Sequence, residues 1–166
     1  MHSLTIAMVL AVASLLFGCA TSPVAPIQTS RNDEFAGTTA CHALTRDFLG
    51  IPSNAACECI QWQLKLHSSD FTGLGTYTLI ATYGILETNR HALYQNGTRT
   101  ETGGKWFTAT NNSDTIMYQL QATSPNRSLA FVKIDENILQ LLTPDRELMV
   151  GNDSWSCTLN RIPKQP

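Results

Sequence analysis

Hydrophobic and polar residues alternate strictly between Ile60 and Leu66. The apolar members of the alternation share one side of an extended chain, and they are Ile60, Trp62, Leu64 and Leu66. A period of two is typical of a half-buried strand whose apolar face points into a core. Two cysteines, Cys57 and Cys59, stand at the entrance of this strand, on the same face if the extended geometry begins there.

The chain after this strand predicts a series of short strands separated by turns. With the first strand, about eight are expected, over residues 60–66, 75–86, 98–102, 105–108, 115–122, 129–134, 139–142 and 154–161. Asn96-Gly97 predicts a hairpin that joins residues 91–95 to residues 98–102. Pro144-Asp145-Arg146 has the composition of a type I turn. This spacing indicates an all-β fold.

One short helix is expected before the strands, over residues 39–48, with Thr38 or Thr39 as its N-cap. Leu44 and Phe48 are four residues apart and could pack on the end of a barrel. The strand series is compatible with an up-and-down barrel or a sandwich. We favour a closed antiparallel barrel, because closure leaves no exposed strand edge.

The first residues have the pattern of an export signal. Residues 1–18 are apolar from Leu4 to Phe17, and Leu16-Phe17-Gly18-Cys19 follows. The Leu-x-Gly-Cys sequence resembles the lipobox of bacterial lipoproteins. The resemblance implies that Cys19 becomes the first residue and carries palmitate-type acyl chains, and that Ala20 directs the protein to the outer membrane. The alternatives are an ordinary signal peptide with a chance cysteine and an uncleaved membrane helix.

Residues 19–39 predict a lipidated, flexible spacer, because they contain Pro, Ser and Asn and few large apolar side chains. Residues 40–166 are left for a single domain, which is long enough to bury a core. Charged residues make up 14% of the chain and the formal net charge is −2. With no basic stripe, nucleic acid is not an expected partner.

Four cysteines remain once Cys19 is lipidated, and an even number in an oxidising compartment predicts disulfide bonds. A bond between Cys57 and Cys59 is disfavoured, because residues two apart on an extended strand hold their Cα atoms too far apart. Cys59 lies deeper in the strand, and the last strand of a barrel pairs with the first. We therefore favour Cys41–Cys57 with Cys59–Cys157 over the swapped pairing.

The order of several short motifs resembles the NlpE N-terminal domain family of envelope lipoproteins. These motifs are Gly50-Ile51-Pro52, Ile60 with Leu64-x-Leu66, Gly75-Thr76-Tyr77-Thr78-Leu79 with Tyr83, Thr102-Gly103-Gly104-Lys105-Trp106, Asp135 to Leu142, and Trp155-Ser156-Cys157-Thr158-Leu159. The resemblance covers residues 47–161 and implies a small lipocalin-like barrel, copper resistance and envelope-stress signalling. The family's Cys-x-x-Cys is degenerate: Cys57 matches its second cysteine, while Ser53 or Asn54 takes the first position and Cys59 replaces the following glycine.

Cys57 and Cys59 have three interpretations. They are structural half-cystines, a thiol–disulfide switch, or a Cu(I) site, since soft thiolates suit that ion. The side chains that could complete a Cu(I) site are His42, His67 and Met117. The lone histidines His42, His67 and His91 are more typical of surface residues than of ligands. Apart from Cu(I), no cofactor is expected.

Two functions from different classes follow. The first is a non-enzymatic envelope lipoprotein whose barrel contacts a partner such as an envelope-stress sensor kinase. The second is a small-ligand carrier or lysozyme-inhibitor-type barrel. Enzymatic activity is not expected, because the sequence lacks Gly-x-Ser-x-Gly, His-Glu-x-x-His and a phosphate-binding glycine loop. Trp62, Trp106 and Trp155 could line a ligand cavity or fill the core, so an internal cavity would favour the second function.

Overall fold

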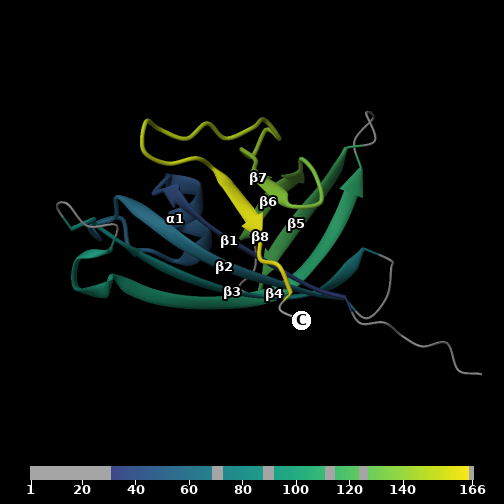
Figure 1. Cartoon of the computed structure of the whole chain (residues 1–166), viewed down its shortest axis with the longest axis horizontal. Coiled ribbons are helices and arrows are strands. Elements are labelled where there is room, and N and C mark those ends of the chain that lie inside the picture. Colours follow the sequence, from purple (N-terminus) through teal and green to yellow (C-terminus); the bar gives the residue numbers. More distant parts are fainter. Residues whose placement is uncertain (1–30, 69–72, 88–91, 111–114, 124–126, 165–166) are drawn as a thin grey trace, which may run out of the picture.

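The computed structural model describes residues 31–68, 73–87, 92–110, 115–123 and 127–164. They form a closed antiparallel barrel in which each strand pairs with the next and β8 pairs with β1 (Figure 1). The strands are β1 (Arg31–Ala40), β2 (Cys59–Ser68), β3 (Leu74–Gly84), β4 (Thr98–Thr110), β5 (Ile116–Ala122), β6 (Ser128–Lys133), β7 (Ile138–Leu141) and β8 (Thr158–Arg161). A helix, α1 (Ala43–Leu49), and a 3₁₀ turn, η1 (Tyr94–Asn96), complete the described elements. The expected small antiparallel barrel with a short N-terminal helix is confirmed.

Large side chains fill the interior of the barrel. The apolar face of β2 points inward as the alternation predicts, and Ile60, Trp62 and Leu64 are at most 1% exposed. The same core cluster contains buried side chains from all eight strands, among them Phe35, Leu79, Trp106, Leu120, Phe131, Leu139 and Leu159. The aromatic residues Trp62 and Trp106 therefore belong to the packed core.

The prediction of a flexible spacer is wrong for residues 31–39, because these residues form most of β1. This strand pairs with β2 along its whole length, from Arg31 opposite Ser68 to Ala40 opposite Cys59. Phe35 is its one large interior side chain and is 1% exposed. A single bulky apolar residue among polar and small ones gives a weak sequence signal, so neighbouring strands rather than local preference define β1. Residues 1–30, with Cys19, lie outside the described residues.

The helix begins later than expected. Thr38, Thr39 and Ala40 continue β1, so α1 starts at Ala43 with His42 in the extended N-cap position. Gly50 ends the helix with φ 68° and ψ 27°, and the amide of Ile51 donates to the carbonyl of Arg46. This left-handed glycine cap explains why the helix stops after Leu49.

The prediction of a hairpin at Asn96-Gly97 is wrong. β4 pairs directly with β3, from Thr98 opposite Tyr83 to Phe107 opposite Leu74. The connecting segment contains η1, and Asn96-Gly97 is its last turn before β4. β4 also runs without a break through Gly103-Gly104, where two strands were expected.

Among the helices of the described residues, none has the length and apolar character that spanning a membrane requires.

Candidate functional site

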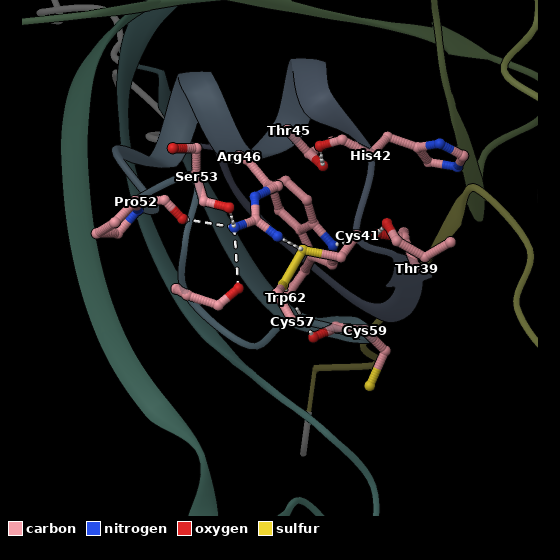
Figure 2. Close-up of a disulfide and its surroundings, with 12 residues drawn as sticks. Thr39, Cys41, His42, Thr45, Arg46, Pro52, Ser53, Cys57, Cys59 and Trp62 are labelled. Carbon is pink, nitrogen blue, oxygen red and sulfur yellow. Dashed lines mark hydrogen bonds between the residues drawn. A yellow bond between two sulfur atoms is a disulfide. The ribbon is translucent and has the colours of Figure 1, made fainter.

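The cysteine-rich end of the barrel combines α1, the turn after it and the start of β2. Cys41 and Cys57 form a disulfide there, with Cα atoms 5.8 Å apart and a sequence separation of 16 (Figure 2). Cys41 directly follows β1 and Cys57 lies two residues before the start of β2, so the bond closes a loop that contains the whole helix. The predicted Cys41–Cys57 pairing is confirmed.

The predicted Cys59–Cys157 bond is wrong, because both residues are buried free cysteines. Cys59 neighbours Ile60 along β2 and pairs with Ala40 and Gly84, so it lies on the opposite face from the inward-pointing Ile60. Cys157 belongs to the interior cluster with Leu159. The two sulfurs therefore lie on opposite faces of the barrel wall. Figure 2 shows the side chain of Cys59 directed away from the Cys41–Cys57 bridge.

Burial disfavours the thiolate form of both free cysteines. Burial raises the pKa of the Cys59 thiol, and the negative charge of Glu58 adds to the increase. Burial also raises the pKa of the Cys157 thiol, whose Sγ lies 3.6 Å from Nε2 of His42. The thiolate is the species that attacks disulfides and binds soft metals. The Cys157–His42 contact therefore links the start of α1 to the segment before β8 without making a reactive nucleophile.

Arg46 fastens the turn that follows α1. Its Nη2 donates hydrogen bonds to three backbone carbonyls, those of Pro52, Ser53 and Ala55 (Figure 2). Its Nη1 lies 3.9 Å from Sγ of Cys41. The guanidinium group is suited to this role because its donors are fixed in one plane. The loop closed by the disulfide is thus also held by the hydrogen bonds of Arg46.

Two contacts join this end of the barrel to the core. The indole Nε1 of Trp62 donates to Oγ1 of Thr39 at 2.9 Å, and Thr39 is fully buried. The ring of Phe48, on α1, stacks on that of Tyr77, on β3, with centroids 6.5 Å apart. The helix is therefore a packed lid on this end of the barrel.

The opposite end of the barrel is polar. Arg161 at the end of β8 pairs with Asp33, and its guanidinium group lies 4.9 Å from the ring centroid of Phe35. A groove of about 920 Å³ beside it is lined by Asn32, Asp33, Glu34, Lys65, His67, Ile162, Pro163 and Lys164. Within the groove Nδ1 of His67 lies 3.0 Å from Oδ1 of Asn32. His67 therefore contacts Asn32 at the end of the barrel opposite the cysteines.

The residues proposed for copper do not come together. The sulfur of Cys57 is bonded to Cys41, and His67 lies eight residues from Cys59 along β2, about 26 Å at the rise of a strand. Met117 packs in a separate cluster with Val132 and Leu142, and Nε2 of His42 lies 3.6 Å from Sγ of Cys157, which was not among the proposed ligands. His91, expected at the surface, lies outside the described residues. Within the described ranges no group of three or more His, Cys, Asp or Glu side chains could hold a metal ion. The oxidised site does not fit Cu(I).

This geometry predicts how the protein responds to copper. Oxidised protein purified from the periplasm is expected to take up no Cu(I) in competition with a chromogenic chelator, because Cys57 has no free thiolate. Reduction frees Cys41 and Cys57 and should permit uptake, and Cys57→Ser should lower that uptake. Cys157→Ser is the matched control, since its buried thiol lies on the interior face. Stoichiometric uptake by oxidised protein would contradict this expectation.

Together, fold and site define a small, closed antiparallel barrel whose one end is covered by a disulfide-linked helix. No family model, curated protein or solved structure matches the chain. The NlpE-type resemblance therefore rests on the sequence motifs alone.

Sequence reasoning identified Cys41 and Cys57 as partners and expected Phe48 to pack on the end of a barrel, which is confirmed, but it did not anticipate the contacts of Arg46 and His42. Arg46 and His42 act through contacts with backbone carbonyls and with a cysteine 115 residues away. Only the position of Arg46 in the last turn of a helix, just before a glycine cap, could have indicated a role at the helix end.

Proposed function

We propose that this protein is a non-enzymatic, lipid-anchored lipoprotein of the bacterial outer membrane that acts by contact between its barrel and a partner protein. An envelope-stress sensor kinase is the partner class that the NlpE-type motifs imply. The anchor is Cys19, and copper tolerance would follow from signalling rather than from a copper site in the barrel.

The observation that carries the proposal is the filled interior. A carrier of small ligands needs a cavity of several hundred Å³ lined by apolar side chains. Here Phe35, Trp62, Phe131 and Leu139 are at most 1% exposed and meet in one cluster. A barrel with such a core offers its outer surface rather than its interior, which favours protein contact over ligand carriage.

The proposal predicts a phenotype that depends on the anchor. Deleting the gene is expected to increase copper sensitivity and to reduce the response of an envelope-stress reporter. The wild-type gene should restore both, whereas Cys19→Ser should not, because it removes the two or three acyl chains that hold the barrel stably at the membrane. Labelled palmitate should enter wild-type protein and not the Cys19→Ser variant.

Two results would contradict the proposal. Equal palmitate labelling of wild-type and Cys19→Ser protein would show that Cys19 is not the lipidated residue. A deletion strain with normal copper tolerance and a normal stress response, whose purified protein inhibits lysozyme, would favour the inhibitor-type alternative instead. That inhibitor would also act through the barrel surface, so the inhibition assay is the measurement that separates the two.

A further inference from the structure

The first half of β4 has a strand neighbour on one side only. β3 pairs with β4 from Thr98 to Phe107, whereas β5 pairs with it only from Gly104 to Thr110. Within the described ranges, residues 98–102 therefore have no strand partner on their second edge. Figure 1 shows this half of β4 along the lower margin of the sheet. Unpaired strand edges carry backbone donors and acceptors that readily accept another strand.

The side chains along this edge have a two-fold pattern. The sequence reads Thr98-Arg99-Thr100-Glu101-Thr102. If a second copy pairs antiparallel with Thr100 opposite Thr100, Arg99 of each copy lies opposite Glu101 of the other. The remaining pairs are threonine opposite threonine. Opposite charges and β-branched pairs are the cross-strand combinations that stabilise antiparallel sheets.

Charge and exposure support this register. The side chains of Arg99 and Glu101 are 58% and 52% exposed and lie 3.0 Å apart on one face of β4. In the paired form each charge would lie between two opposite charges. Shifting the strands by one residue would place the charges of one copy opposite threonines of the other and on the other face. The charges would therefore select the register, while backbone hydrogen bonds supply most of the attraction.

We propose that two copies of this protein associate through the free edge of β4, with the two-fold axis at Thr100. The contact is isologous, so it closes as a dimer and does not propagate into fibres. The Gly103-Gly104 segment, where pairing with β5 begins, limits the length of the edge and hence of the contact. The dimer goes beyond the proposed function, since it would form whether or not a sensor kinase is the partner.

Cysteine cross-linking in cells that produce the full lipoprotein tests the register. Thr100→Cys is expected to give a disulfide-linked dimer under mild oxidation, because residues opposite each other in an antiparallel pair have Cα atoms about 4.5–5.5 Å apart, within bridge range. Thr98→Cys alone should not cross-link, but cells that also produce Thr102→Cys should form the mixed dimer. Thr76→Cys, exposed on the neighbouring strand β3, is the matched control.

Charge exchange tests the same contact without altering Thr100. In the Thr100→Cys background, Arg99→Glu or Glu101→Arg alone should lower the cross-linked fraction by about tenfold, the effect of about 1.4 kcal/mol spread over two repulsive pairs. The double exchange Arg99→Glu with Glu101→Arg should restore it. Equal cross-linking of Thr76→Cys and Thr100→Cys, or no loss in the single charge variants, would overturn the dimer. A cross-link from Thr100→Cys to a different protein alone would instead assign the edge to a partner strand.

Discussion

Replacing Trp62 with alanine is expected to lower the free energy of unfolding by about 3–5 kcal/mol. Trp62 is 1% exposed in the middle of β2. Its neighbours across the two adjacent strands are Gly37 and Ala81, which are small and leave room for the indole. Removing the indole would open a large cavity that these small neighbours cannot fill.

The same substitution removes a hydrogen bond. The indole Nε1 donates to Oγ1 of the fully buried Thr39, and a buried hydroxyl that loses a partner is costly. Trp62→Phe should therefore fall between wild type and Trp62→Ala, since it keeps most of the volume and loses the donor. Urea denaturation followed by circular dichroism measures all three.

Trp155→Ala is the control for this series. Trp155 is only partly buried and belongs to neither core cluster. Its loss should cost about 1 kcal/mol or less, the typical cost of a substitution away from the core. A Trp62→Ala variant as stable as Trp155→Ala would mean that the indole does not fill the barrel.

The sequence predicted the barrel because alternation is a local signal that burial on one face produces directly. The strand containing Tyr77, Leu79 and Ala81 and the strand ending at Ala122 were expected close to their observed bounds. β1 was not expected, because its pairing with ten residues of β2 supplies the stability that its own composition lacks. Long-range pairing of this kind has no counterpart in a local pattern.

The candidate site was only half predictable. Cys41 and Cys57 flank the predicted helix, so the sequence indicates that a bond between them closes a loop around it. The error at Cys59 was avoidable, because the alternation that places Ile60 inside already places Cys59 outside, while Cys157 shares the interior face of Leu159. The hydrogen bonds from Arg46 to the carbonyls of the next turn were not predictable, since they depend on the path of the backbone after Gly50.

The second large effect concerns the Cys41–Cys57 bond. Replacing both cysteines by serine is expected to lower the free energy of unfolding by about 3 kcal/mol, the chain-entropy value for a loop of this size. The sequence separation of the bonded cysteines is 16. The variant should keep its fold, because Phe48 still packs on Tyr77 and Arg46 still holds the turn.

Reductant provides a control that also tests the cysteine assignment. Adding it should lower the unfolding midpoint of wild-type protein in urea to that of the double serine variant. It should leave the variant itself unchanged, because Cys59 and Cys157 are already free thiols on opposite faces of the barrel wall. If reductant destabilises the variant further, a second disulfide is present, and the only remaining pair in the barrel is Cys59 with Cys157. The same two measurements thus give the strength of the bond that closes the helix and decide whether the last strand is covalently fastened to the start of β2.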